Sequence, residues 1–288
     1  MELIEPVVKS VTNVVSQEKT MTGLGKRFGG STAVYSLRDV GAGGGRVVNI
    51  RRDSDDTTQD FTAAQLLAGD ADTFVGASNN GFVAIWYDQN SEANNLTAAS
   101  ANQPLIVSSG TLVTDNGKPA MDFNGSDQFL NFTKQLRFNT TTTDSAYDLA
   151  NMVFSVCNIT AGNRSFIGTR GSNHTWFGVP YNGNFIFRDD ASGSNDNIYN
   201  TGVAVTLDTQ QLLTFDNTAS NTIKGYKDGS LIYTVDNAAI DQYFRFEEFA
   251  AGYSTNENDM KVQELVFFPY TSTNRSLIED NMLAYHGI

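Results

Sequence analysis

Acidic side chains in the second half of the chain are the residues best suited to chemistry. Asp189 and Asp190 are adjacent, Glu247 and Glu248 are adjacent, and Glu257 follows them. Two carboxyl groups held about 5–5.5 Å apart can cleave a glycosidic bond, one as nucleophile and one as acid/base. We weigh these five carboxylates as such a pair against the simpler interpretation that each is a solvated loop or strand-edge charge.

Other catalytic or cofactor chemistry has little support in the sequence. His174 and His286 are the two histidines, and neither has a cysteine at metal-ligand spacing, so we expect no zinc site. Neither histidine belongs to a recognisable Ser/His/Asp motif. The glycine-rich segment 41–45 lacks the Lys-Ser/Thr of a phosphate-binding loop and is interpreted as a turn. We expect no bound cofactor.

Two loops are rich in oxygen ligands. They are Asp53-Ser-Asp-Asp56 and Asn124-Gly-Ser-Asp127. Both could hold Ca²⁺, which prefers carboxylate and carbonyl oxygen. The same residues also make turn and capping hydrogen bonds, and this second interpretation is favoured. Whether a metal binds is left open by the sequence.

Composition excludes several classes of protein. The chain has 288 residues, enough to bury a substantial core, and its net charge of −13 disfavours a phosphate-binding surface for nucleic acid. No apolar run reaches the ~20 residues of a transmembrane helix, so no membrane insertion is expected. The N-terminus has no signal-peptide pattern.

The single cysteine, Cys157, excludes an intrachain disulfide, which favours assembly in a reducing cytoplasm. We interpret Cys157 as a buried small hydrophobe.

The elements that must position any site are mostly strands. Apolar and β-branched runs bounded by Gly, Asn and Asp predict strands at 46–51, 82–87, 119–123, 151–158, 184–188, 211–215, 222–227, 230–235 and 261–268. Asp228-Gly229 and Asn182-Gly183 predict hairpin turns. Capping boxes starting at Thr62 and Ser276 predict short helices, with Leu66/Leu67 and Leu277/Ile278/Met282 as their buried faces. We predict a mainly β, two-sheet antiparallel β-sandwich with few short helices.

Residues 1–30 differ from the sandwich predicted for 31–288. Valines at 7, 8, 11, 14 and 15 recur at helical spacing, and segment 22–30 is a glycine-rich link. A short helix of β-branched residues is marginal in water, so it needs a partner, either another copy or a docking surface. A strand or loose tail is the alternative. We interpret 1–30 as an anchoring or oligomerisation arm, in a homo-oligomer such as a trimer.

Two segments resemble the catalytic domain of fungal α-L-arabinofuranosidase B. They are Ala33-Val-Tyr-Ser-Leu-Arg38 with Arg51-Arg-Asp-Ser-Asp-Asp56, and Trp86-Tyr-Asp-Gln-Asn90 followed by Asn94-Asn95-Leu96. The same segments also resemble structural proteins of tailed bacteriophages that lack the active site. The second segment departs from the family's Ser-Gly-x-Gly loop, because Asn90-Ser-Glu-Ala93 has no glycine.

A second resemblance covers roughly residues 105–288. Gly117 to Leu130, the hairpin Ile223-Lys-Gly-Tyr-Lys-Asp-Gly-Ser-Leu-Ile-Tyr233, and the ending from Val262 to Ile288 are similar to laminin-G-like domains. That family has the concanavalin A-like jelly-roll fold. The resemblance implies a lectin-like sandwich, a fold that binds sugars, binds proteins or hydrolyses glycans.

The resemblance to arabinofuranosidase B allows a catalytic test. The family's nucleophile segment matches Trp176-Phe-Gly-Val-Pro-Tyr-Asn-Gly-Asn-Phe-Ile186, which places Asn182 at the glutamate. Its acid/base segment matches Ala251-Gly-Tyr-Ser-Thr-Asn256, which places Tyr253 at the aspartate. An amide forms no glycosyl-enzyme intermediate, and a phenol with a pKa near 10 is a poor acid/base. We therefore predict no catalytic residues and no enzyme activity.

These observations lead to the interpretation of a bacteriophage virion protein, a fibre, tail or capsid-surface component at the virion surface, made in the host cytoplasm. Its arm would bind other virion proteins, and its sandwich would bind host cell-surface glycans. The candidate glycan-binding residues are Trp176, Tyr181, Asn182, Tyr199 and Tyr253. For each aromatic, packing in the core is the alternative.

Two other functions stay open. One is a glycoside hydrolase or depolymerase acting on host polysaccharide, and it predicts release of reducing sugar. The other is a purely architectural capsid decoration protein, and it predicts many copies per particle and no affinity for glycans.

Overall fold

The structure is a computed structural model that describes residues 31–41, 45–90, 94–138, 148–161, 165–169, 175–181, 183–188, 198–217, 222–236, 244–252, 257–269 and 275–288. The predicted arm at 1–30 lies outside these residues and stays a prediction. In the described part of the chain, no helix is long and apolar enough to span a membrane.

The first half of the chain forms a strand-rich region with two short helices. Its elements are β1 (Ala33–Ser36), β2 (Arg46–Arg52), β3 (Thr58–Thr62), α3 (Ala63–Ala68), α4 (Asp70–Val75), β4 (Gly81–Trp86), β5 (Leu96–Thr97), a 3₁₀ turn (Ser100–Asn102), β6 (Leu105–Ser108), β7 (Thr111–Leu112), β8 (Thr114–Asp115), β9 (Lys118–Pro119), β10 (Met121–Asn124) and β11 (Leu130–Phe138).

The second half is strands followed by one helix. Its elements are β12 (Asp148–Ala150), β13 (Met152–Ile159), β14 (Ile167–Gly168), β15 (Trp176–Tyr181), β16 (Asn184–Arg188), β17 (Ile198–Ala204), β18 (Gln210–Asp216), β19 (Thr222–Lys227), β20 (Ser230–Asp236), β21 (Phe244–Phe249), β22 (Asp259–Phe268) and α5 (Arg275–His286).

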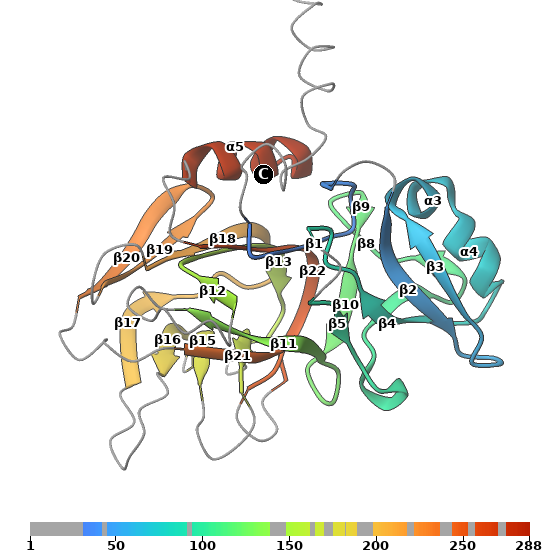
Figure 1. Ribbon diagram of the computed structural model, residues 1–288, viewed down its shortest axis with the longest axis horizontal. Helices are drawn as coiled ribbons and strands as arrows, with labels where there is room; N and C mark the ends of the chain where they lie inside the picture. The colour runs from blue at the N-terminus through green and yellow to red at the C-terminus, as the bar shows by residue number, and fades with distance from the viewer. Residues whose placement is uncertain are drawn as a thin grey trace, which may run out of the picture.

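All the strands except β8 and β9, which form a separate two-stranded sheet, belong to one large curled sheet in which nearly every pairing is antiparallel. Hydrogen bonds connect them in the order β20-β19-β18-β13-β22-β10-β6-β4-β5-β11-β21-β14-β15-β16-β17. The curl brings its two ends together, because Tyr233 of β20 packs on Phe185 and Phe187 of β16. Figure 1 shows β13 and β18 on one side of the interior and β11 and β21 on the other. The fold is therefore mainly β, as predicted.

An aromatic core fills the curl. Phe177 of β15 lies at its centre, with ring centroids 4.8 Å from Phe138, 5.0 Å from Phe215 and 5.0 Å from Phe246. These rings meet edge to face, the arrangement that the aromatic quadrupole favours. The rings come from β11, β15, β18 and β21, so the core holds together strands that are distant in sequence.

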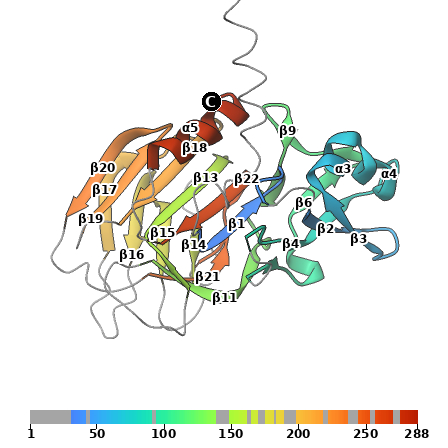
Figure 2. The ribbon, with the colours of Figure 1, turned by 45° about the horizontal axis from the view of Figure 1, so that its top comes forward.

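A smaller extension of the sheet carries the first two helices. β2 pairs with β3 and β4, and α3 and α4 lie beside them at one end of the molecule (Figure 2). The capping box predicted at Thr62 is confirmed. The Thr62 hydroxyl accepts a hydrogen bond from Gln65 N, and Thr62 N donates to Gln65 Oε1 at 2.9 Å.

Helix α5 covers the outer side of β13, β18 and β22 (Figure 1). Beneath it lies Glu264 of β22, which is fully buried. Arg38 donates from Nε to Glu264 Oε1, and His286 Nε2 lies 2.8 Å from the same oxygen. Arg38 also donates to Asn281 Oδ1 at 2.8 Å. This charged cluster ties the segment after β1, strand β22 and α5 to one another.

Most strand predictions are confirmed, and 184–188 and 222–227 match β16 and β19 in their bounds. The Asp228-Gly229 turn is confirmed, since both residues have positive φ, 49° and 78°, as the tight hairpin turn requires. Asn182 lies outside the described residues, but Gly183 has φ 82° and Tyr181 pairs with Asn184.

The predicted buried faces of the helices are wrong in two positions. Leu67 and Leu277 are 62% and 50% exposed, whereas Leu66, Ile278 and Met282 are buried. Neighbouring residues on a helix point about 100° apart, so a short helix that covers one surface cannot bury both. Helix α5 also begins at Arg275, one residue before the serine predicted to cap it.

The buried carboxylate of Glu264 predicts acid sensitivity. Burial disfavours its charge, but Arg38 and His286 outweigh burial and lower its pKa from 4.5 to about 2. A lowered pKa in the folded state stabilises the fold at pH values above 4.5, and this stabilisation is lost as pH falls from 4.5 towards 2. We expect Glu264→Gln to reduce the free energy of unfolding at pH 7 by about 3–5 kcal/mol, since it leaves Arg38 buried without its counter-charge.

Urea unfolding measured between pH 7 and pH 2.5 checks this expectation. The matched control is Asp127→Asn, which makes the same chemical change on an exposed turn and should leave the pH profile unaltered. A Glu264→Gln protein with the stability and acid sensitivity of the parent would contradict the assigned role.

Candidate functional site

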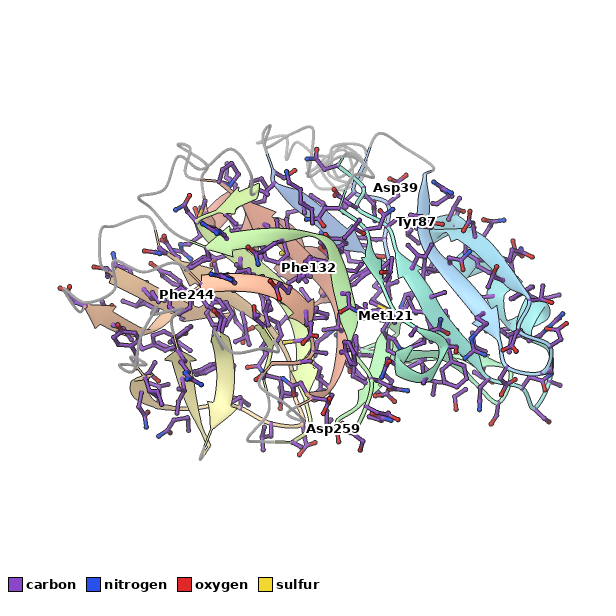
Figure 3. All side chains as sticks on the ribbon, turned by 60° about the horizontal axis from the view of Figure 1, so that its bottom comes forward. Asp39, Tyr87, Met121, Phe132, Phe244 and Asp259 are labelled. Atoms are coloured by element: carbon purple, nitrogen blue, oxygen red, sulfur yellow. The ribbon has the colours of Figure 1, made fainter. Side chains whose placement is uncertain are left out.

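One row of residues crosses five strands of the sheet in register. Arg188 of β16 is opposite Trp176 of β15, which is opposite Gly168 of β14. Gly168 is opposite Glu248 of β21, which is opposite Asn131 of β11. Neighbouring strands lie about 4.8 Å apart, so Arg188 and Glu248 are separated by roughly 14 Å. The row crosses the part of the sheet that Figure 3 shows from the side of β11 and β21, where Phe132 and Phe244 are labelled.

The alternation of the strands fixes which face of the sheet carries the polar side chains. Leu130 and Phe132 flank Asn131 and belong to the aromatic core, and Phe187, which precedes Arg188, also does. Side chains alternate across a strand, so Asn131 and Arg188 project from the opposite, outer face. Glu248 is the register partner of Asn131 and projects from that face too. We call the outer face of β11, β14, β16 and β21 the candidate face.

A sharp turn folds the chain over the middle of this row. Ala250 follows β21 with φ 63°, and its N–H donates to Phe166 O at 2.8 Å. Beyond it, Ala251 and Gly252 pack directly on Gly168. A methyl group at Gly168 would lie 3.0 Å from Gly252 Cα and 3.2 Å from Ala251 O. Segment 251–256, matched above to the acid/base loop, therefore begins directly over Gly168.

The candidate face carries buried charges. The exposed fractions of Arg137 and Arg188 are 6% and 8%, and that of Glu248 is 8%. Arg245 is half-buried and lies opposite Arg137 in the register of β11 and β21. Glu247 accepts a hydrogen bond from Gln135 Nε2. Arg137, Arg188, Arg245 and Glu248 all have interaction partners within the chain, as buried charges require.

The predicted glycan-binding residues fall largely at the edge of what the structure describes. Asn182 and Tyr253 lie outside the described residues, and for Trp176 and Tyr181 the backbone alone is described. Tyr199 is 6% exposed and contributes to the aromatic core. Its ring packs inside the curl, which agrees with the alternative that this aromatic residue belongs to the core. Glycan binding by this set of residues stays a prediction.

The five candidate carboxylates separate into groups. Glu248 lies on the row, Glu247 precedes it, and Glu257 is buried beyond the turn at 250–252. Asp189 and Asp190 directly follow Arg188 and lie outside the described residues. The structure thus places Glu248 two strands from Trp176, with residues 251–252 packed over the strand between them.

The two oxygen-rich loops make the predicted turn contacts. Asp55 pairs with Arg52 and accepts from Thr57 N at 3.1 Å, and the guanidinium of Arg52 lowers the pKa of the exposed Asp55 carboxyl. Asn124 Oδ1 accepts from Ser126 N at 3.0 Å. The described part of the chain contains no cluster of three or more His, Cys, Asp or Glu side chains placed to hold a metal ion.

Sequence reasoning missed the arginines of the candidate face. A signal was present, because Arg137 stands between Leu136 and Phe138, and Arg245 stands between Phe244 and Phe246. An arginine between two core residues of a strand projects from the opposite face of the sheet, which is the outer face here. That the two arginines meet depends on the register of β11 with β21, which the sequence does not reveal.

Solved structures of three glycoside hydrolases resemble this fold, each over 88% of the chain. They are a variant GH54 α-L-arabinofuranosidase soaked with 4-nitrophenyl α-L-arabinofuranoside (TM-score 0.56, 17% identity), a GH54 α-L-arabinofuranosidase soaked with a cyclic sulfate inhibitor (0.55, 17%), and an arabinofuranosidase complexed with arabinofuranosyl-α-1,2-xylobiose (0.54, 16%). The chain spans 62% of the length of each of these proteins. No family model and no curated protein matched the sequence.

At 16–17% identity this likeness establishes the fold and not the activity. It nevertheless corrects the interpretation of the sequence. These three proteins, which share the fold over 88% of the chain, are arabinofuranosidases, so the prediction of a non-catalytic phage virion protein, and of no enzyme activity, is wrong. The glycoside hydrolase alternative agrees better with the finding. A phage origin has no support in these comparisons.

The packing at Gly168 generates a prediction on stability. We expect Gly168→Ala to lower the free energy of unfolding by about 1–3 kcal/mol, because the new methyl group would lie 2.5 Å from Thr175 O and press against the 251–252 backbone. Thermal and urea unfolding measure this loss. Gly45→Ala is the control, since a methyl group there meets no atom within 4 Å. Equal stability of the two variants would show that the turn does not pack as described.

Proposed function

We propose that this protein is a glycoside hydrolase that acts on a polysaccharide. Its fold would be a two-sheet antiparallel jelly-roll sandwich, formed where the sheet curls around the aromatic core. The likeness to three arabinofuranosidase structures supports the class of enzyme. α-L-Arabinofuranosides, which two of those structures contain, are the first substrates to test.

The position of Glu248 is the observation that carries this proposal. The strand β15, which begins the segment matched to the nucleophile motif, is separated from β21 by the short strand β14 alone. The segment matched to the acid/base motif starts beyond β21 and folds back over β14. Glu248, the register partner of Gly168, therefore lies beside the start of that second segment and two strands from Trp176, on the face away from the core.

The proposed mechanism uses a displaced pair of carboxyl groups. Asn182 and Tyr253 stand at the family's catalytic positions and cannot replace a carboxylate nucleophile and a carboxylic acid/base. We propose that Glu248 provides one carboxyl group of the pair. Glu257, which is buried beyond the turn at 250–252, would provide the other carboxyl group.

Replacing Glu248 tests the proposal directly. We expect Glu248→Gln to lower the rate of glycoside hydrolysis by at least about 100-fold, because an amide provides neither nucleophile nor acid/base. Glu247→Gln, the neighbouring change of the same chemistry, should alter the rate by no more than a few-fold. The measurement is release of 4-nitrophenol from a panel of 4-nitrophenyl glycosides, α-L-arabinofuranoside first, together with reducing-sugar release from plant and bacterial polysaccharides.

Circular dichroism and thermal unfolding establish that both variants are folded. A parent protein that cleaves no member of the panel and no polysaccharide would refute the proposed function. If Glu248→Gln hydrolyses glycosides at the parental rate, Glu248 is not a catalytic residue, and the observation on which the proposal rests is lost.

A further inference from the structure

A polar cavity lies where helix α5 ends on the outer side of the sheet. Val156 of β13 and Leu212 of β18 are register partners, and both pack under the helix. Two residues away, at the next outward position of each strand, Asn158 is the register partner of Gln210. Helix α5 ends at His286. Beside its end, Asn158 and Gln210 line a cavity of about 450 Å³.

Hydrogen bonds hold the walls of this cavity in place. Asn116, in the turn between β8 and β9, donates from Nδ2 to His286 O at 2.8 Å. Gly287 follows the helix with φ 71° and forms the second wall. The third wall includes Asp208, in the loop before β18, whose N–H donates to Ile159 O at 2.8 Å. The sheet, the helix end, the turn and the loop therefore build the cavity together.

The cavity has more hydrogen-bond acceptors than the described part of the chain satisfies. Asp115 Oδ2 and Asn158 Oδ1 have no hydrogen-bond partner there, and both residues are half-buried and line the cavity. The carboxylate of Asp208 is exposed, and no hydrogen bond or ion pair connects it to the described residues. Enclosed polar atoms in proteins are normally hydrogen-bonded. A ligand that fills this cavity must therefore provide hydrogen-bond donors.

The charges around the cavity disfavour an acidic ligand. Asp115 and Asp208 line it, and no lysine, arginine or histidine side chain is among the lining residues. Three lysines lie next to this region and are engaged by other groups: Lys118 with the Tyr285 ring, Lys261 with Thr114 O, and Lys227 with Thr206 Oγ1. Two more carboxylates, those of Asp228 and Asp259, are also close by. A carboxylate accepts hydrogen bonds and donates none, so an anionic ligand would find repulsion here.

The rest of the lining favours a ligand rich in hydroxyl groups. Asn116, Thr209 and Gln210 provide amides and a hydroxyl, which both donate and accept. Among the lining residues Ile288 is the one large apolar side chain, so an apolar ligand, or the methylene chain of a polyamine, would bury little surface. Sugar hydroxyls also donate and accept. The volume lies within the range of about 300–1,000 Å³ that is common for small-molecule sites.

We propose that this cavity binds a neutral sugar unit and is a second carbohydrate site, separate from the candidate face. The sugar hydroxyls donate to Asp115, Asn158 and Asp208. The cavity lies on the outer side of β13 and β18, beside α5, whereas the candidate face includes the outer side of β11 and β21 across the interior (Figure 1). Binding here needs no catalytic group, so it is independent of the proposed function. A polysaccharide held at this cavity stays at high local concentration around the protein.

Backbone amide chemical shifts of the full chain test the inference. The titrations use the parent protein and Glu248→Gln, which keeps a ligand intact if the parent cleaves it. The ligands are the neutral trisaccharides of arabinose, xylose, glucose and galactose, and the trisaccharide of galacturonic acid as the acidic counterpart. We expect at least one neutral trisaccharide to shift the amides of 115–116, 208–210 and 287 with a Kd of about 1 mM or lower. The galacturonic acid trisaccharide should leave these amides unshifted.

Variants of the cavity identify the residues responsible. Asp208 has φ 55°, a left-handed conformation that asparagine also adopts, so Asp208→Asn removes the carboxylate without straining the loop. It should weaken binding of the neutral trisaccharide by about 10-fold, and Asn158→Ala should weaken it by about 5-fold. Asp56→Asn is the matched control, since Asp56 is exposed with φ 58° in the loop between β2 and β3. It should leave the affinity unchanged, and thermal unfolding establishes that each variant is folded.

Several outcomes would overturn the inference. One is the absence of shifts at the cavity amides with every neutral trisaccharide at about 10 mM. Another is an affinity that Asp208→Asn leaves unchanged, or that Asp56→Asn reduces equally. Shifts caused by calcium chloride or spermidine, and by no sugar, would also overturn it, because they would assign the cavity to a cation.

The proposed function succeeds or fails separately. Sugar-induced shifts confined to the candidate face, with glycoside hydrolysis by the parent protein, would overturn the inference and keep the proposed function. Shifts at the cavity that depend on Asp208, in a parent protein that hydrolyses no glycoside, would support the inference and refute the proposed function.

Discussion

The structure depends on β22, a strand that is buried on both faces. Leu265 and Phe267 enter the aromatic core, while Val266 and Phe268 pack beneath α5. Three strands, β1, β10 and β13, pair with it, so it joins the early strands of the chain to the late ones. Within this apolar strand Glu264 can be ionised only because Arg38 and His286 reach it. A single buried carboxylate therefore fixes the segment after β1 and the C-terminal helix against the same strand.

The aromatic core also determines where the chemistry can be. Because apolar residues of β11, β16 and β21, many of them phenylalanine, point into the curl and fill it, the residues beside them leave from the outer face. Arginine and glutamate occupy those positions, and the glycine at 168 opens the middle of the row to the turn at 250–252. The same alternation that builds the core thus assembles a charged surface from strands that are far apart in sequence.

Local signals in the sequence predict local structure well. The Asp228-Gly229 turn, the Thr62 capping box and the bounds of β16 and β19 depend on residues close to one another, and each agrees with the structure. The buried Cys157 also agrees. The candidate site could not be predicted in the same way, because the meeting of Arg137 with Arg245 and of Gly168 with Glu248 depends on strand register. The residues Asn182 and Tyr253, at the positions matched to the catalytic motifs, predict loss of activity, and the likeness to three arabinofuranosidase structures contradicts that prediction.

The burial of Cys157 gives the molecule an internal reporter of its own unfolding. This thiol is the one cysteine of the chain, lies at the centre of β13, and has a pKa that burial raises to about 12. At neutral pH it is protonated and enclosed, so a thiol-reactive dye in solution meets no nucleophile while β13 stays paired with β18 and β22. Labelling can proceed once those strands separate. The rate at which a dye is incorporated therefore reads the opening of the central strands, without any engineered probe.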